Sequence, residues 1–511
     1  MFLASGVAWI ASGISHTCAV TTSGRAKCWG QNYTFGRLGD GTTLPRTTAI
    51  NISGFINGGS PMEAGGFHTC ALGTNGVVKC WGFNGSGQLG AGTWSDHNTP
   101  VSVSGLPSAI AISAGYRHTC ALTSAGGVKC WGYNNAGQLG NNSNVSSNTP
   151  VDVSGLTSGV IAISAGNTHT CALTSAGGVK CWGYNNTGQL GNNSTTNSSV
   201  PVDVNGLTSG VIAISAGEGH TCALTSGGGV KCWGANANGQ LGDGTNTQRL
   251  TPVSVNNLTS GVASISAGNF HSCAVTTSGG VKCWGKNGHG QLGDGTTSDH
   301  NAPVNVTNLT SGATAIVGGI DQTCAQTDGG GMKCWGYNVD GRLGNNTTTE
   351  SRTPVDVYGL GSGVVIGITT GFNHSCALTS IGQKCWGSNS YGQIGDGTTI
   401  QRLAPVSVVT GTLATYTYGD PNHKHAVTAL SSGESYTYDA NGNMRQRVEG
   451  GVTYTQTFDA ENRLISVSGS GQTTQFIYDG DGNLVKKIKP DGSKTIYIGG
   501  VYEVDKNAGG A

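Results

Sequence analysis

The sixteen cysteines are the residues of this sequence best suited to chemistry, and they fall into eight pairs. Seven pairs are ten residues apart, and the last pair is nine apart. Thiols paired at such spacings can form disulfides, bind a metal or stay as buried free thiols. The pairs are Cys18 with Cys28, Cys70 with Cys80, Cys120 with Cys130, Cys171 with Cys181, Cys222 with Cys232, Cys273 with Cys283, Cys324 with Cys334 and Cys376 with Cys385.

The turn between the two cysteines of a pair predicts a β-hairpin in which Cys120 lies opposite Cys130. Opposite residues of antiparallel strands have Cα atoms about 4.5–5.5 Å apart, within the roughly 4.4–6.8 Å that a disulfide needs. We therefore expect one cross-strand disulfide per pair and an oxidising compartment. Buried free thiols are the alternative. The spacing of nine between Cys376 and Cys385 shifts the expected register of the last pair.

A histidine precedes the first cysteine by two places in seven of the eight copies, and Gln322 takes that place in the remaining one. Together with the two cysteines it could suggest zinc, but each copy would offer only three clustered ligands. We interpret the histidines as buried side chains that hydrogen-bond to a loop, and we expect no metal and no cofactor. They are His16, His68, His118, His169, His220, His271 and His374.

The elements that position these residues are internal repeats. The first cysteines of successive copies are separated by 52, 50, 51, 51, 51, 51 and 52 residues, a near-constant period typical of a solenoid or propeller. One copy contains four short β-patterned segments, at residues 160–164, 169–174, 179–182 and 200–204. Four strands in about 50 residues make one propeller blade. The sequence thus predicts an all-β propeller of eight blades over residues 6–408, with seven blades and one displaced copy as the alternative.

The two ends of the repeat region predict how the ring closes. The first copy lacks a preceding Pro-Val-x-Val strand, and the last copy ends with one at residues 405–408. We expect residues 7–10 to pair with that strand, which would leave no long edge exposed.

Three further positions of each copy have a predicted structural role. Trp131 lies on the opposite face of its strand from Cys130, so we expect its indole between blades. Gly137 and Gly140 bound a Gly-Gln-Leu-Gly turn that needs positive φ.

The segments 118–122 (His-Thr-Cys-Ala-Leu), 130–132 (Cys-Trp-Gly) and 137–140 resemble the regulator of chromosome condensation repeat. The resemblance covers residues 6–408. It implies a β-propeller, usually of seven blades, whose intracellular members keep their thiols free.

From about residue 412 the pattern changes, because cysteine and tryptophan stop and tyrosine increases. Tyr438-Asp439, Phe458-Asp459 and Tyr478-Asp479 recur every 20 residues and are followed by turn residues typical of hairpins. Residues 412–505 resemble the Tyr-Asp (YD) repeat of rearrangement-hot-spot (Rhs) and teneurin-like proteins. The resemblance implies a bacterial, polymorphic-toxin-like or adhesin protein, and we expect the chain to be a fragment of one.

Composition and sequence patterns argue against several classes of function. Charged residues are only 10% and the net charge is zero, so we expect no nucleic acid partner. No run of about 20 apolar residues predicts a membrane span, and the start lacks the basic segment of an export signal. No Ser/His/Asp or paired-carboxylate pattern indicates an enzyme.

The leading hypothesis is a non-catalytic, monomeric interaction or display scaffold, secreted or at the cell surface, that binds an unidentified protein or cell-surface ligand. Variable loops such as 93–98 and 347–352 are expected to carry specificity. The alternative is an intracellular guanine-nucleotide exchange factor or chromatin-associated regulator, as the propeller resemblance implies.

Overall fold

The computed structural model describes residues 7–56, 61–361, 365–380, 382–410, 416–417, 429–430, 435–449, 452–479, 484–498 and 502–506. The chain divides into two compact units, Met1–Gly411 and Thr412–Ala511. Gly6, the first residue of the predicted propeller, and the turn predicted at 480–483 lie outside the described residues.

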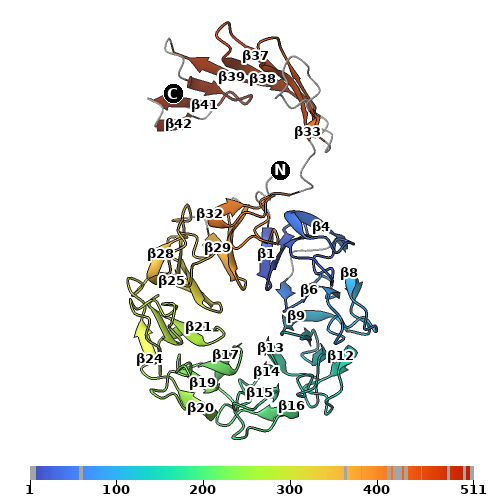
Figure 1. The fold of residues 1–511 in the computed structure, drawn as a ribbon, viewed down its shortest axis with the longest axis vertical. Coiled ribbons are helices and arrows are strands. Elements are labelled where there is room, and N and C mark those ends of the chain that lie inside the picture. The colour runs from blue at the N-terminus through green and yellow to red at the C-terminus, as the bar shows by residue number, and fades with distance from the viewer. Residues whose placement is uncertain are drawn as a thin grey trace. The chain divides into compact units, whose positions relative to one another are not determined.

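The first unit is a ring of eight four-stranded antiparallel sheets around a central opening (Figure 1). In every sheet the strands follow sequence order from the centre to the rim. The all-β propeller of eight blades is thereby confirmed, and the seven-bladed alternative is wrong.

The innermost strands are rich in alanine and β-branched residues, which suit a pleated, half-buried surface. They are β1 (Val7–Ser12), β5 (Met62–Ala64), β9 (Ala109–Ala114), β13 (Val160–Ala165), β17 (Val211–Ala216), β21 (Val262–Ala267), β25 (Ala313–Gly318) and β29 (Val365–Thr370). The second strands begin at the repeated histidine or at Gln322. They are β2 (His16–Thr21), β6 (His68–Leu72), β10 (His118–Thr123), β14 (His169–Thr174), β18 (His220–Thr225), β22 (His271–Thr276), β26 (Gln322–Thr327) and β30 (His374–Thr379).

The third strands carry the second cysteine and the tryptophan. They are β3 (Arg25–Gly30), β7 (Val78–Gly82), β11 (Val128–Gly132), β15 (Val179–Gly183), β19 (Val230–Gly234), β23 (Val281–Gly285), β27 (Met332–Gly336) and β31 (Gly382–Gly387). The fourth strands lie at the rim, where proline is tolerated because the strand is an edge. They are β4 (Arg46–Ile56), β8 (His97–Ser102), β12 (Ser147–Asp152), β16 (Ser198–Asp203), β20 (Arg249–Ser254), β24 (His300–Asn305), β28 (Ser351–Asp356) and β32 (Arg402–Ser407).

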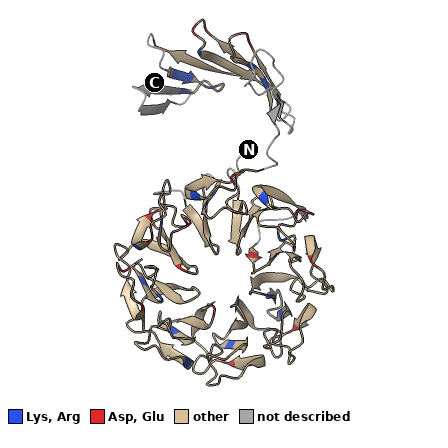
Figure 2. Cartoon of the chain, in the orientation of Figure 1, with Lys and Arg blue, Asp and Glu red and all other residues tan. Residues whose placement is uncertain are grey.

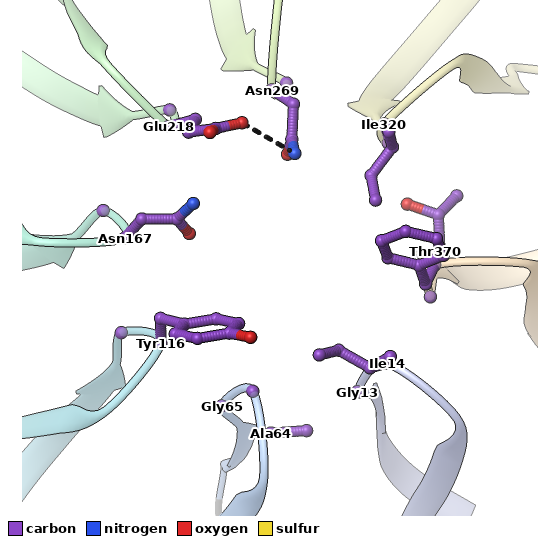
Figure 3. A pocket seen from close by; sticks show the side chains of 18 of the residues that line it. Gly13, Ile14, Ala64, Gly65, Tyr116, Asn167, Glu218, Asn269, Ile320 and Thr370 are labelled. Carbon is purple, nitrogen blue, oxygen red and sulfur yellow. Dashed lines mark hydrogen bonds between the residues drawn. The ribbon is translucent and has the colours of Figure 1, made fainter.

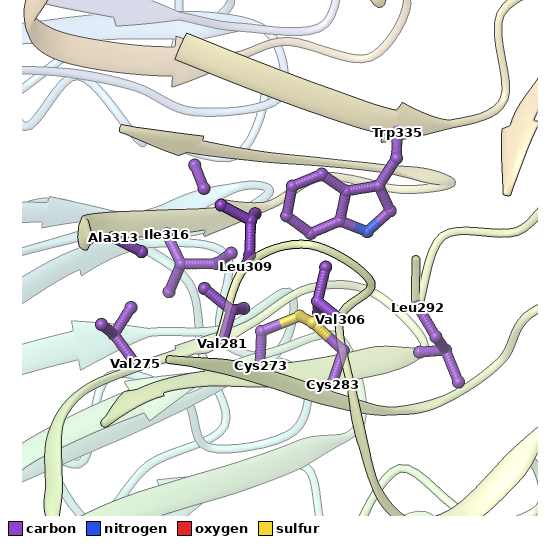
Figure 4. Close-up of a cluster of buried hydrophobic side chains, with 11 residues drawn as sticks. Cys273, Val275, Val281, Cys283, Leu292, Val306, Leu309, Ala313, Ile316 and Trp335 are labelled. Atoms are coloured by element: carbon purple, nitrogen blue, oxygen red, sulfur yellow. A yellow bond between two sulfur atoms is a disulfide. The ribbon is translucent and has the colours of Figure 1, made fainter. Parts of the chain in front are cut away.

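The core of the ring lies between blades. Each cluster of buried side chains combines the disulfide of one blade with the tryptophan of the next, as Cys273, Cys283 and Trp335 do in Figure 4. All eight of these indoles are fully buried. A blade therefore has both faces covered by its neighbours, which is why a second strand such as β10 is buried along its whole length.

The predicted closure of the ring is wrong. Residues 7–10 pair with β2 and not with residues 405–408, because β4 already completes the first blade. The ring closes by face-to-face packing instead, with Val7, Trp29, Cys376 and Val408 in one buried cluster. A hydrogen bond from the Ala49 amide to the Val409 carbonyl, 2.8 Å long, adds to this closure.

The second unit is a ten-stranded antiparallel meander whose strands follow sequence order. At two hairpins Asp439 and Asp459 accept backbone N–H bonds from the residue four places later, at 3.0 and 2.8 Å. The strands are β33 (Tyr416–Thr417), β34 (Ala429–Leu430), β35 (Ser435–Tyr438), β36 (Met444–Glu449), β37 (Val452–Phe458), β38 (Leu464–Gly469), β39 (Gln472–Tyr478), β40 (Leu484–Ile488), β41 (Lys494–Ile498) and β42 (Tyr502–Lys506).

Charged residues are few, and Lys, Arg, Asp and Glu positions are scattered over the described blades (Figure 2). Within the described part of the chain, no helix has the length and apolarity needed to cross a membrane.

Candidate functional site at the mouth of the ring

A repeated hydrogen-bond relay joins each blade to the next. His118 Nε2 lies 2.9 Å from Thr170 Oγ1 in the next blade, and this hydroxyl lies 3.3 Å from the carbonyl of Gln138. The indole Nε1–H of Trp182 donates to the same carbonyl at 2.9 Å. We call this set of contacts the seam.

The hydrogen bonds of the seam determine which ring nitrogen of His118 carries the proton. The single hydroxyl proton of Thr170 points to the Gln138 carbonyl, so His118 Nε2 must carry a proton and donate it. Nδ1 of His118 is then the bare nitrogen, and among the described residues it has no hydrogen-bond partner although it is buried. Burial lowers the pKa of His118 to about 3, because a second proton would place a charge on a fully buried ring.

We predicted that the side chain of the histidine bonds to a loop, and this prediction of the partner is wrong. The hydroxyl group that His118 contacts belongs to β14, a strand of the next blade. The ring geometry explains this difference, because the second strands of neighbouring blades face each other. Gln322, which replaces the histidine in blade seven, instead donates from Nε2 to the carbonyl of Gly371 at 3.2 Å.

The Gly-Gln-Leu-Gly turn supplies the carbonyl of the seam. Gly137 and Gly140 have φ of 83° and 68°, in the region that favours glycine. A Cβ placed on Gly140 would lie 2.9 Å from Cδ1 of Trp182, so the turn needs glycine to receive the indole of the next blade.

The structure joins the sixteen cysteines in eight disulfides and leaves no cysteine free. In every pair the Cα atoms are 4.1 Å apart, slightly closer than the range expected from the sequence. The bonded pairs are those predicted: Cys18 with Cys28, Cys70 with Cys80, Cys120 with Cys130, Cys171 with Cys181, Cys222 with Cys232, Cys273 with Cys283, Cys324 with Cys334 and Cys376 with Cys385.

The register shift expected for the last pair does not occur. Cys376 lies directly opposite Cys385, as Cys120 lies opposite Cys130. The missing residue is lost from the turn, where Thr379 faces Gly382.

Among the described residues, no group of three or more His, Cys, Asp or Glu could hold a metal ion.

The eight loops between first and second strands converge on the central opening and line a cavity of about 650 Å³ (Figure 3). Each loop is held closed at its base, as by the bond of 3.0 Å from the Gly115 amide to the His118 carbonyl. The residue after the loop glycine differs from blade to blade and lines the cavity in each. In order around the ring these residues are Ile14, Gly66, Tyr116, Asn167, Glu218, Asn269, Ile320 and Phe372.

The side chains that line this mouth differ in polarity from one side of the cavity to the other. Asn167, Glu218 and Asn269 come from three consecutive blades and point into the cavity (Figure 3). Isoleucine, tyrosine and phenylalanine side chains line the other sides, together with glycines, alanines, Ser12 and Thr370. Of the described residues, Glu218 is the only one with an acidic or basic side chain in the lining, and partial burial raises its pKa. It accepts a hydrogen bond of 3.1 Å from Asn269 Nδ2.

An aromatic cluster continues outward from the mouth over blades one to three. The ring of Tyr116 lies 5.4 Å from that of Phe67, and Phe67 in turn lies 6.3 Å from Phe83. The guanidinium of Arg117 lies 5.8 Å from the Tyr116 ring, in the range of a cation–π contact. This face therefore offers rings and cations beside the mouth.

Sequence reasoning placed specificity in rim loops and missed the mouth. Trp94, in the predicted loop 93–98, is indeed exposed, but the rim loops do not line the cavity. A signal for the mouth exists in the sequence: in the pattern Gly-x-x-His, which ends in Gln in one copy, the glycine is repeated in all eight copies while both x positions vary.

Ring, seam and disulfides together define the class of this protein as a β-propeller of serially repeated blades. A family model described as the RCC1-like domain matches residues 97–438, and the regulator of chromosome condensation (RCC1) repeat matches residues 9–37 and 62–88. The chain belongs to the RCC1-like domain family. The RHS repeat matches residues 458–494. The resemblances to the RCC1 and Rhs repeats are therefore confirmed.

Several curated proteins are similar to this chain. The ultraviolet-B receptor UVR8 of Arabidopsis thaliana is 32% identical over 404 residues, which cover 78% of this chain and 80% of UVR8. The E3 ubiquitin-protein ligase HERC2 of Homo sapiens is 34% identical over 254 residues, which cover 48% of this chain and only 5% of HERC2.

Two solved structures share the fold. Yeast RCC1 (Prp20), in its complex with Kap60, aligns with a TM-score of 0.54 at 21% identity and covers 66% of this chain and 84% of its own. Human WBSCR16 aligns with a TM-score of 0.52 at 22% identity and covers 63% and 87%.

Proposed function

We propose that this protein is a non-catalytic, exported interaction ring that binds a protein or a cell-surface ligand, either free outside the cell or displayed at its surface. The observation that carries the proposal is that every cysteine stands opposite another on the neighbouring strand, with the Cα atoms 4.1 Å apart in each pair. Such a complete set of cross-strand pairs is expected in an oxidising compartment and rare in a reducing one.

The shape of the ring supports binding rather than catalysis. The cavity at the mouth has a single carboxylate among the described residues, and the histidines of the seam are buried with Nε2 engaged. A general acid or base needs to reach a substrate, which these histidines do not. The variable residues are instead spread over eight loops around one opening, as in a recognition surface built on a constant frame.

The second candidate is an intracellular regulator, such as an exchange factor or a chromatin-associated protein. The membership of the RCC1-like domain family favours it. An intracellular regulator would have free thiols in place of the disulfides, because a reducing compartment keeps cysteines reduced.

Thiol titration of the full chain purified from its native source distinguishes the two. The protein is denatured under a thiol-blocking reagent, with and without prior reduction, and labelled thiols are counted by intact mass. We expect all sixteen cysteines to be labelled only after reduction. Labelling of nearly all of them without reductant would refute the exported ring and favour the intracellular regulator. Light scattering on the same sample tests the proposal that the ring is a monomer.

A further inference from the structure

The mouth of the ring has the composition of a site for a cation carried on an apolar stem. A cavity of about 650 Å³ falls within the range of roughly 300–1,000 Å³ that ligand pockets occupy. One wall carries amide and carboxylate side chains and the remaining walls are mostly apolar or aromatic, so the cavity can solvate one end of a ligand and cover the rest.

The polar wall favours positive charge. Glu218 is the one charged group that the described residues contribute to the lining, and none of them brings a lysine, arginine or histidine side chain there to neutralise it. Its carboxylate receives a hydrogen bond from Asn269, which leaves acceptor positions for a ligand. Asn167 points into the same space from the preceding blade (Figure 3), and its amide oxygen can accept a bond from an ammonium or guanidinium group.

The opposite walls suit the stem. Ile14 and Ile320 present aliphatic surface, and Tyr116 presents the face or edge of a ring (Figure 3). Aromatic rings attract cations as well as covering methylene groups. The cavity is too large for one small amine to fill, whereas a short loop or a chain end would occupy it around a central side chain.

We propose that the mouth binds a lysine or arginine side chain presented by a loop or chain end of a protein partner, with Glu218 as the counter-charge. This inference rests on the proposed role as a protein-binding ring. It specifies that the partner presents a cationic side chain. The residues that would contact this positive charge come from the fourth, fifth and sixth blades.

The test uses the full chain and four fluorescein-labelled pentapeptides of the form Leu-Gly-x-Gly-Leu, blocked at both ends. The central residue x is lysine, arginine, norleucine or glutamate. Fluorescence anisotropy is expected to show at least about tenfold tighter binding of the lysine or arginine peptide than of the norleucine peptide, because charge-assisted hydrogen bonds to a partly buried carboxylate are stronger than neutral contacts. Equal binding of all four, or binding of none up to millimolar concentration, would overturn the proposal.

Variants locate the site. Glu218→Gln keeps the shape and the bond to Asn269, and is expected to lose the tenfold preference for the cationic peptides. Glu350→Gln is the matched control, because Glu350 is also a half-buried carboxylate of a loop, pairs with His289 and does not line the cavity. Retained preference in Glu218→Gln, with thermal unfolding showing an intact ring, would contradict the assignment. Tyr116→Leu is expected to weaken the cationic peptides severalfold.

Competition with n-butylamine separates a polypeptide partner from a free small amine. We expect it to displace the lysine peptide only at much higher concentration, and equal potency would overturn the polypeptide assignment. These outcomes are independent of the thiol titration. Failure of binding by protein with all its disulfides intact refutes this inference, while free thiols would refute the exported ring.

Discussion

The buried histidines of the seam link the stability of the ring to acid. Each one is neutral in the folded protein, with its pKa lowered by burial to about 3 for His118 and about 4 for His169, whereas in the unfolded chain it titrates near 6.5. Below that value the unfolded chain binds more protons than the folded one, so stability is present above pH 6.5 and is lost as the pH falls toward 4.

We predict that His118→Gln makes the ring less sensitive to acid. One buried histidine accounts for a slope of up to about 1.4 kcal/mol per pH unit in the free energy of unfolding between the two pKa values. Urea denaturation at a series of pH values from 7 to 4 measures this slope. The reciprocal variant, Gln322→His, is expected to make the slope steeper, and equal slopes in all three proteins would contradict the explanation.

Glu63 of β5 differs from the residues at the same position in the next four innermost strands. It faces Cys70 across the sheet, at the place where the next four blades have serine. Two of these serines, Ser113 and Ser164, accept a backbone N–H of the following blade at 3.0 and 3.1 Å. Burial raises the pKa of Glu63 to about 7, so its carboxyl binds protons more tightly in the folded protein than in the unfolded chain.

We predict that Glu63→Ser stabilises the ring at pH 8. A raised carboxyl pKa means that stability is greatest below the unfolded value near 4.5 and is lost as the pH rises toward 7. Each unit between the two pKa values corresponds to about 1.4 kcal/mol, so the gain at pH 8 should vanish at pH 4.5. Chemical denaturation at both values measures it, and a variant of unchanged stability at pH 8 would show that the carboxylate costs nothing there.

At the scale of one blade, the disulfide closes the hairpin between the second and third strands. The bond between Cys120 and Cys130 spans ten residues of sequence and is fully buried. Closing so short a loop restricts the unfolded chain by about 2–3 kcal/mol. Burial behind the tryptophan of the next blade also shields the sulfurs from reductant while the ring is folded.

We predict that the double variant Cys120→Ala, Cys130→Ala folds but loses about 2–3 kcal/mol in the free energy of unfolding. Cys171→Ala with Cys181→Ala is the matched control in the next blade and should lose a similar amount, since both pairs have the same separation and burial. Urea denaturation of the three proteins checks this. Losses that differ widely between the blades would contradict the equivalence of the repeats.

The elements were predictable because each strand carries its own pattern and the pattern is repeated eight times. The predicted closure was wrong because it looked for a Pro-Val-x-Val strand before the first copy, whereas in the structure the fourth strand follows the other three of its own blade. In the first blade this strand is β4, which reads Arg-Thr-Thr-Ala-Ile-Asn and lacks the motif. The sequence marks the variable positions after the loop glycine, but the inward direction of Asn167 or Glu218 depends on the ring and could not be predicted from the local sequence.

At the scale of the whole ring, the seam between the chain ends repeats the seam between internal blades. His374 Nε2 lies 2.8 Å from Thr17 Oγ1, and this hydroxyl donates to the carbonyl of Gln393 at 3.1 Å. Trp29 donates to that carbonyl at 2.9 Å, as Trp182 does to Gln138.

We predict that Thr17→Val and Thr170→Val destabilise the ring equally, by about 1–3 kcal/mol each, because both leave a buried imidazole N–H without an acceptor. Thr170→Ser is the control and should be nearly neutral, since Ser272 already serves His220 at 2.8 Å. Chemical denaturation measures all three. A much smaller loss for Thr17→Val would show that the closing seam is weaker than the others.

Because the closing seam uses the same kinds of bond as the internal seams that contain a histidine, these bonds do not themselves fix the number of blades. Removing or adding one whole repeat in the gene leaves each remaining histidine, hydroxyl, carbonyl and indole with a partner of the same kind. Such a change alters the curvature of the ring and the width of its opening, and it changes which side chains meet there. If the ring binds a partner at its mouth as proposed, gain or loss of a copy is a direct route to a different binding surface that leaves the core unchanged.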